Sequence, residues 1–459
     1  MNKTMNDTLR WLPLEGNLRD RVSDVLKDIA EHFRDPNEVL QKSQNAKLKV
    51  DGLEVERWIG ESLSSGYPGI CLLIGQLDQL EPNAGWDLIG HQYLKEIQRK
   101  LEETGLRDLS LYGGLSGILL AIRSLSRNGT RYQSMIDQIA TWMEELASQR
   151  VKELITHWEQ SHLQMGDYDT IMGLSGIGRI VLSFYDRPGM RDVWHHIVTW
   201  FQLFCVPKSL GTEKIPGWHI SSQNQFLAYE KDKYPNGNFN LGISHGISGP
   251  IALMSIAIIN GVQSKELGDK VHELTHWLVN WKVEGDKGVY WPGKVSYEEW
   301  KHGSLNNENL LFPRDSWCYG VPGIARSIWL ASQALQNNEW SRIALQAYMD
   351  MEARIENNGG MISATLCHGL AGWLQLIQRM YSDTGEPTLG LMRDRLVESV
   401  LDFYDPTSKF GYHDVNLIDG KLLNLDEAGL LNGAAGVAIV LASLLGNESP
   451  EWDQILLIR

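Results

Sequence analysis

The chain lacks the features that would place it among disulfide-rich, secreted or membrane-spanning proteins. Its 459 residues include four cysteines, too few for a disulfide framework in a chain of this size. The longest apolar runs, at 250–259 and 434–445, are too short to span a bilayer. Residues from Met1 onward lead into a polar and charged stretch, so no signal peptide is visible. We therefore expect a protein of the reducing cytoplasm that does not span a membrane.

An excess of positive charge is also missing. The net charge is -15, and the sequence has no cluster of Lys and Arg that would form a basic surface, so we expect no nucleic-acid partner. Low-complexity linkers are absent as well. With 43% hydrophobic and 22% charged residues, the composition is typical of a globular protein.

What the chain does contain is a repeated Gly-x-x-Gly pair that opens an apolar run seven times. The pairs are Gly66/Gly69, Gly114/Gly117, Gly173/Gly176, Gly246/Gly249, Gly320/Gly323, Gly369/Gly372 and Gly433/Gly436. A helix that is apolar on nearly every face belongs in a protein interior. Between these runs lie amphipathic stretches with helical spacing, for example 135–146, 265–281, 340–355 and 391–404.

This alternation predicts an all-α fold, an α/α toroid that forms a double seven-helix barrel. The glycines permit tight turns at the entry to each inner helix, so all seven N-termini are expected at one mouth of the barrel. We predict an N-terminal helical extension over 1–60 and the seven-repeat barrel over 61–459. Two turn-rich insertions, 206–241 and 284–316, are expected to hold a small β-containing flap near the mouth, with no other β-structure.

Three side chains just before the repeat glycines form a candidate metal site. Cys318 and Cys367 both lie two residues before a motif glycine, and His368 follows Cys367 directly. Two thiolates and one imidazole leave the fourth tetrahedral position of zinc open, as catalytic zinc requires. A lone cysteine is more often a small buried hydrophobe, and we assign Cys71 and Cys205 to packing.

His245 lies one residue before its motif glycine, the same offset as His368. It is expected at the same mouth, where an imidazole outside the metal shell can exchange a proton near neutral pH. Asp169 and Arg314 precede their glycines by four and six residues and are within reach of the mouth. A helix-capping role remains an alternative for His245 and for Asp169. For Arg314 the alternative is a plain surface charge.

Four motifs together resemble those of the LanC-type lanthionine synthetase cyclases, and the resemblance covers almost the whole chain. They are Tyr168-Asp169-x-x-x-Gly173-Leu-Ser-Gly176, Ser244-His245-Gly246, Arg314-Asp-x-Trp317-Cys318-Tyr319-Gly320 and Cys367-His368-Gly369. Any single Gly-x-x-Gly is weak, but the set is specific.

The resemblance implies one zinc ion per chain, held by Cys318, Cys367 and His368. It implies an acid/base role for His245, assisted by Asp169 and Arg314. Trp317 and Tyr319, which flank Cys318, are assigned to substrate binding. The implied reaction adds a cysteine thiolate to a dehydroalanine or dehydrobutyrine and closes a lanthionine or methyllanthionine thioether ring.

The implied substrate is a dehydrated precursor peptide. The resemblance adds a separate dehydratase and an export transporter as partners, and a peripheral location at the inner face of the cell membrane through such a complex. The chain is too short for a fused dehydratase domain, which favours the stand-alone type of cyclase.

Other functions are less well supported. A glycosidase would need paired carboxylates at the mouth, whereas the motif offsets supply Asp169 alone. Prenyl transferases, which also activate thiols with zinc, usually have a carboxylate ligand and different repeats. A relative of the family that binds glutathione or serves as an adaptor, without cyclase activity, shares the motifs and stays open as an alternative.

Overall fold

Seven helices begin at the seven Gly-x-x-Gly pairs in the computed structural model, which describes residues 11–44, 47–50, 53–160, 162–262, 265–307, 315–355, 360–418 and 420–459. In six of the helices the first glycine of the pair is the N-cap residue, and in α11 the N-cap is Ile247. The predicted inner helices are thus confirmed as elements. They are α3 (Tyr67–Leu80), α5 (Leu115–Ser124), α8 (Leu174–Ser183), α11 (Ser248–Ile259), α14 (Val321–Leu335), α17 (Leu370–Thr384) and α19 (Ala434–Leu445).

The second glycine of a pair is needed because backbone approaches it closely. A Cβ atom on Gly176 would lie 2.2 Å from the carbonyl oxygen of Thr170, and one on Gly436 would lie 1.8 Å from that of Leu430. Real Cβ contacts are not that short, so only glycine lets the first turn of these helices pack on the preceding loop.

Contacts divide the chain into two compact units. Unit 1 comprises Met1–Asp108, Tyr112–Asp137 and Arg354–Asp453, and unit 2 comprises Leu109–Leu111, Gln138–Ala353 and Gln454–Arg459. The predicted division into 1–60 and 61–459 follows the sequence repeats and stays a prediction.

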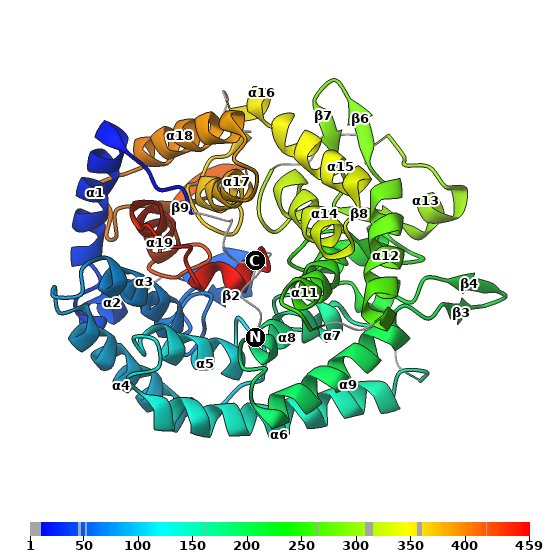
Figure 1. The fold of residues 1–459 in the computed structure, drawn as a ribbon, viewed down its shortest axis with the longest axis horizontal. Helices are drawn as coiled ribbons and strands as arrows, with labels where there is room; N and C mark the ends of the chain where they lie inside the picture. Colours follow the sequence, from blue (N-terminus) through cyan, green and yellow to red (C-terminus); the bar gives the residue numbers. More distant parts are fainter. Residues whose placement is uncertain are drawn as a thin grey trace. The chain divides into compact units, whose positions relative to one another are not determined.

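Amphipathic helices pack against the repeat helices within each unit (Figure 1). In unit 1, α3 contacts α4, α5 and α19, while α17 contacts α18 and α19. In unit 2, α11 lies between α8 and α14, and α8, α11 and α14 contact α9, α12 and α15 respectively. The amphipathic helices are α1 (Gly16–Glu31), α4 (Trp86–Thr104), α6 (Gln133–Thr156), α9 (Pro188–Phe204), α12 (Lys265–Asn280), α15 (Asn338–Met349) and α18 (Pro387–Asp402).

Short helices also occur within the described residues. They are α2 (Pro36–Ser43), α7 (Met165–Tyr168), α10 (Ala228–Lys233), α13 (Tyr297–His302), α16 (Glu352–Ile355) and the 3-10 turns at Ser222–Asn224 and Trp452–Leu456. None of the helices within the described ranges combines the length and the apolar character needed to cross a bilayer.

Backbone hydrogen bonds join the loops that precede the repeat helices. The bonded residues lie two places before their motif glycine, except Thr170, which lies three places before Gly173, so successive repeats are tied at nearly equivalent positions. In unit 1 the donors and acceptors are Cys367 N to Leu431 O, Leu431 N to Ser64 O and Ser64 N to Tyr112 O; in unit 2 they are Thr170 N to Ser244 O and Ser244 N to Cys318 O. The shared offset of Cys318 and Cys367 in the sequence therefore corresponds to a shared position in the repeat.

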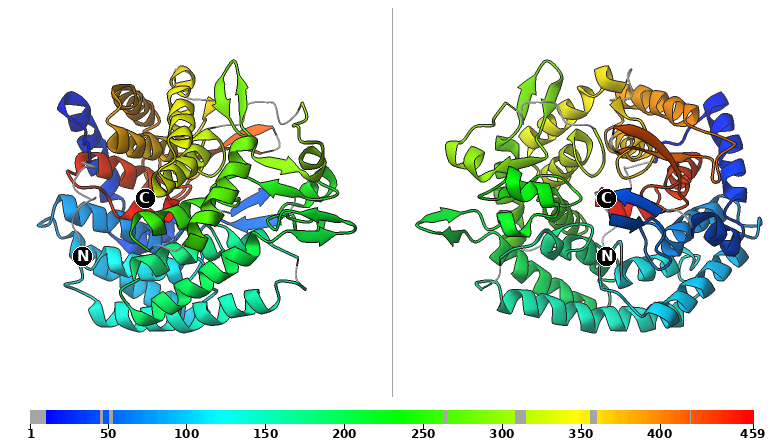
Figure 2. Two further views of the ribbon diagram at one scale, coloured as in Figure 1. Left: turned by 45° about the vertical axis from the view of Figure 1, so that its right-hand side comes forward. Right: turned by 180° about the vertical axis from the view of Figure 1, so that it is seen from behind.

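Among the described residues, five antiparallel strand pairs accompany the helices. Three fall in or beside the predicted insertions: β3 (Lys208–Leu210) with β4 (Glu213–Ile215), β5 (Asn238–Asn240) with β8 (Lys294–Ser296), and β6 (Val283–Gly285) with β7 (Gly288–Tyr290). The β3–β4 hairpin projects away from helices α9 and α12 of its unit (Figure 2).

The expectation that β-structure is confined to these insertions is wrong. β1 (Lys47–Val50) pairs with β2 (Leu53–Glu56), and β9 (His413–Ile418) pairs with β10 (Lys421–Asp426). Both segments flank an Asp-Gly dipeptide, which is a strong hairpin signal, and the first also alternates polar and apolar residues. The first pair also corrects the prediction that 1–60 is helical. Among the described residues of this segment, α1 and α2 are helices and β1 and β2 are strands.

Candidate functional site

His245 is oriented by Asp169. His245 lies in the loop between β5 and α11, and its Nδ1 is 2.5 Å from Oδ2 of Asp169. The His245 side chain is 28% exposed, whereas Asp169 is buried. A carboxylate that accepts from Nδ1–H leaves Nε2 as the nitrogen that can exchange a proton with a bound molecule.

Asp169 has a second, structural task that its sequence position had left open. Its Oδ1 accepts hydrogen bonds from the backbone amides of Met172 and Gly173, at 2.7 and 2.8 Å. These bonds hold the turn that leads into α8 and fix the carboxylate in place. The N-cap residue of α8 is Gly173, so Asp169 holds the turn before the helix instead of capping it, and the same side chain also contacts His245.

Cys318 lies in a tight turn ahead of α14. Ser316 Oγ donates to the carbonyl of Tyr319 at 2.5 Å and lies 3.4 Å from Cys318 Sγ. The turn ends at Gly320, whose φ of 107° would strain any other residue.

The turn of Cys318 is attached to the loop of His245. Both the amide and the hydroxyl of Ser244, the neighbour of His245, donate to the Cys318 carbonyl, at 3.4 and 3.2 Å. Gly242 completes the contact, since a Cβ atom there would lie 2.7 Å from both the Cys318 carbonyl oxygen and the Tyr319 ring. The structure thus brings together three of the predicted site residues, Asp169, His245 and Cys318, within unit 2.

The two aromatic residues that flank Cys318 have different environments. Trp317 is fully buried, and its indole N–H donates to the carbonyl of Leu456 at 2.9 Å. It anchors the turn from inside, so its assignment to substrate binding is corrected. Tyr319 is half-buried and accepts a hydrogen bond from Asn240, and burial raises the pKa of its phenol.

Cys367 and His368 occupy the loop before α17 in unit 1, both half-buried. The ring Nε2 of His368 faces Oδ1 of Asp414, in strand β9, at 3.5 Å. Burial favours a raised pKa for Asp414, but the neighbouring His368, the hydrogen bond from Asn416 and the charge of Arg57 outweigh it and lower the pKa. The carboxylate next to His368 is therefore held in its charged form.

Two further features near the site were missed in the sequence. Phe226 stacks on His245, with ring centroids 6.0 Å apart, and is 71% exposed. Asp414 and its partner Arg57 lie outside the Gly-x-x-Gly offsets that identified the other residues. No local signal marks these contacts, because each joins segments that are distant in the chain.

The remaining predicted residues divide as follows. Cys71 and Cys205 are buried, and burial raises the pKa of both thiols, as expected of packing residues. Arg314 lies outside the described residues.

The donor set of Cys318, Cys367 and His368 suits zinc in its chemistry, since thiolate sulfur and imidazole nitrogen are the usual ligands of this ion. Cys318 belongs to unit 2, and the other two belong to unit 1. Over the described parts of the chain, no three His, Cys, Asp or Glu side chains are gathered as a metal-binding group. The zinc site therefore stays a prediction.

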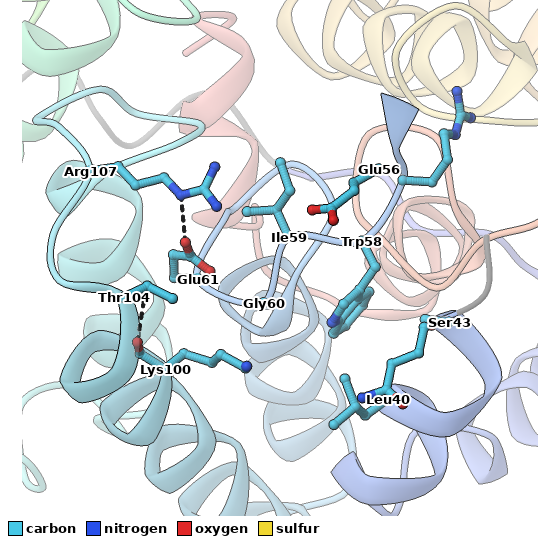
Figure 3. Close-up of a pocket in the computed structure, with 12 residues that line it drawn as sticks. Leu40, Ser43, Glu56, Trp58, Ile59, Gly60, Glu61, Lys100, Thr104 and Arg107 are labelled. Carbon is cyan, nitrogen blue, oxygen red and sulfur yellow. Dashed lines mark hydrogen bonds and ion pairs between the residues drawn. The ribbon is translucent and has the colours of Figure 1, made fainter. Parts of the chain in front are cut away.

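A separate cavity of about 260 Å³ in unit 1 lies between strand β2 and helix α4 (Figure 3). Its charged walls are paired in part, with Arg107 donating to Glu61 at 2.6 Å. The predicted ligands and His245 are not among its lining residues, which are Leu40, Ser43, Gln44, Glu56, Arg57, Trp58, Ile59, Gly60, Glu61, Lys100, Thr104 and Arg107.

Comparison with known proteins gives three consistent findings. The family described as "Lanthionine synthetase C-like protein" matches residues 57–457. The nisin biosynthesis protein NisC of Lactococcus lactis subsp. lactis is 27% identical over 398 residues, which are 86% of this chain and 88% of NisC. A solved structure of nisin cyclase superimposes with a TM-score of 0.75 and 23% identity over 97% of this chain and 98% of that one. This likeness shows the fold, and it confirms the predicted all-α toroid.

Proposed function

Because the chain belongs to the lanthionine synthetase C-like family, we propose that it closes thioether rings in a dehydrated precursor peptide. The observation that carries the proposal is the 2.5 Å pair of His245 and Asp169, attached through Ser244 to the turn of Cys318. An oriented imidazole beside a cysteine at a zinc-ligand position suits a reaction that activates a thiol and moves a proton.

The proposed step adds the S–H of a peptide cysteine across the C=C bond of a dehydroalanine or dehydrobutyrine. The sulfur forms a bond to the β-carbon, the thiol proton is released, and the α-carbon gains a proton. His245 delivers that proton from Nε2 while Asp169 holds Nδ1–H and stabilises the charged ring before transfer. No oxidant or reductant is needed, because the addition of a thiol across a C=C bond gives a thioether with no net oxidation or reduction.

We assign one zinc ion per chain to Cys318, Cys367 and His368. Zinc, when bound, would supply the acidity that keeps the substrate thiol deprotonated at neutral pH. Arg314 is assigned to the developing enolate oxygen on sequence grounds. Tyr319 keeps its assignment to substrate binding.

The natural setting of this reaction is proposed as the cytoplasm. A dehydratase must supply the substrate, because the proposed chemistry consumes a dehydrated residue. Association with that enzyme and with an exporter would place the chain at the inner face of the cell membrane.

The test is incubation of the purified chain with a dehydrated, Cys-containing peptide, followed by thiol alkylation and mass spectrometry. Cyclisation leaves the peptide mass unchanged and removes the alkylation sites, so the expected result is loss of alkylated product with time. Persistent alkylation at all cysteines, together with saturable binding of glutathione, would instead support the non-enzymatic alternative.

A further inference from the structure

Asp414 lies against His368 from a segment between two Gly-x-x-Gly pairs, away from the offsets that identified the other site residues. It belongs to strand β9, its side chain is fully buried, and its Oδ1 is 3.5 Å from Nε2 of His368. Within the described residues that oxygen has no hydrogen bond at normal distance. A buried carboxylate oxygen that faces a half-buried imidazole requires a reason, because burying a polar atom without a hydrogen bond is costly.

The other oxygen of Asp414 is firmly held. Oδ2 accepts from Nη2 of Arg57 at 2.6 Å and from the side-chain amide of Asn416 at 2.8 Å. Arg57 donates from Nε to Glu427 as well, so one guanidinium joins two buried carboxylates. This network fixes the carboxylate of Asp414 before any ligand arrives.

The position of Asp414 has a chemical consequence for His368. An imidazole with its proton on Nε2 carries its lone pair on Nδ1. Metal-binding histidines commonly donate their second N–H to a carboxylate, which fixes the tautomer and increases the basicity of the nitrogen bound to metal.

We propose that Asp414, held by Arg57 and Asn416, is a positioning residue that orients His368 and keeps Nδ1 as its metal-binding nitrogen. The proposal rests on the proposed function, in which His368 is a zinc ligand. It assigns a role to the β9–β10 hairpin, which the repeats alone leave unexplained.

The neighbouring pair of His413 and Asp405 provides a matched control. His413 Nε2 lies 3.2 Å from Oδ2 of Asp405, so the geometry is of the same kind. The Asp405 side chain is 40% exposed, and neither residue lies at a repeat offset. Loss of this carboxylate should leave zinc binding unchanged.

The experiment measures the zinc affinity of the purified chain by competition with a chromophoric chelator. Asp414→Asn is expected to bind zinc about 10- to 100-fold more weakly than wild type, the usual effect of removing such a partner. Asp405→Asn should bind as wild type does, and circular dichroism should show both variants folded. A folded Asp414→Asn with wild-type affinity would overturn the proposal.

Should Asp414→Asn fail to fold, ¹⁵N-histidine NMR of the wild-type zinc protein tests the same point. The His368 resonance, identified by its loss in His368→Gln, should show zinc on Nδ1 and a proton on Nε2; zinc on Nε2 would overturn the proposal. Failure of the proposed function looks different, since wild type would then bind no zinc or leave the dehydrated peptide uncyclised.

Discussion

At the scale of single residues, the contact of His245 with Asp169 decides which ring nitrogen can take part in chemistry. Oδ1 of Asp169 is occupied by two backbone amides, and Oδ2 is occupied by Nδ1 of His245. The carboxylate cannot rotate without breaking the turn before α8. The imidazole is therefore presented to substrate through Nε2 in one orientation.

Replacement of His245 by Asn should remove the proton donor and leave the fold and the metal in place. General acid/base catalysis is worth about 10²–10⁴-fold, so ring closure should slow by that order without stopping entirely. Alkylation and mass spectrometry give the rate, and elemental analysis gives the zinc content. Cyclisation by His245→Asn at the wild-type rate would mean that the proton comes from another group.

Glu427 should make the stability of the metal-free protein depend on pH. Burial raises its pKa to about 7, although Arg57 opposes the shift. A carboxyl whose folded pKa is raised stabilises the fold below about pH 4.5, its unfolded value, and this contribution is lost as the pH rises through 7. In the wild type, the free energy of unfolding should therefore fall by on the order of 3 kcal/mol between pH 5 and 8, and this fall should be absent in Glu427→Gln.

Thermal unfolding at both pH values measures this difference. Glu398→Gln, which changes an exposed carboxylate paired with Arg21, serves as the control and should keep the wild-type pH dependence. An equal fall in melting temperature for Glu427→Gln and wild type would contradict the assignment.

At the scale of elements, the Gly-x-x-Gly pairs set how each repeat helix enters its unit. The first glycine caps most of the helices, and the second permits contact with the loop carbonyl six residues earlier, as Gly176 does with Thr170. The same loops carry the site residues. Helix entry and site geometry are therefore coupled through a few backbone contacts.

Gly176→Ala should destabilise the chain. The new Cβ would lie 2.2 Å from the Thr170 carbonyl oxygen and 2.9 Å from Leu111 Cβ, and backbone must shift to accept it. Overpacking of this kind costs about 1–3 kcal/mol. The melting temperature reports the loss.

Gly268→Ala, in α12 of the same unit, is the matched control. Its nearest neighbour would be Leu335 Cδ2 at an ordinary 3.5 Å, so the helix should gain stability, by up to about 1 kcal/mol. If both substitutions had the same effect, the close approach at Gly176 would not explain the motif.

At the scale of the whole molecule, the fold and the family agree with the repeats. The resemblance to lanthionine synthetase cyclases is confirmed by the family match over 57–457. The chain is accordingly a lanthionine synthetase in class, an enzyme that forms carbon–sulfur bonds. Its metal stoichiometry is the property of the whole chain that most directly tests the proposed mechanism.

We expect about one zinc per chain, because three protein ligands and one open position describe a single catalytic ion. Cys318→Ala and Cys367→Ala should each lose most of the metal. Cys71→Ala should retain it, since Cys71 is a buried residue of α3. Mass spectrometry for elemental zinc measures all three, and full retention in both ligand variants would refute the assigned site.

The sequence by itself determined the repeat helices and the positions of the chemistry-bearing residues. Both are local properties, since helical periodicity and a residue's offset from a motif glycine depend only on neighbours in the chain. Asp169, His245 and Cys318 could be assembled in this way because each lies within four residues before the first glycine of its pair, in the loop that leads into a repeat helix. The β1–β2 and β9–β10 hairpins also had a local signal, the Asp-Gly dipeptide, which was overlooked because the surrounding sequence was interpreted as helical.

Tertiary structure decided the contacts that join distant segments. Only packing shows that Trp317 points inward to Leu456 and that Phe226 stacks on His245. Only packing brings Arg57 and Asp414 to His368. The offset of a residue predicts which loop carries it, but the partner of its side chain is selected by burial and charge among segments that the sequence keeps apart.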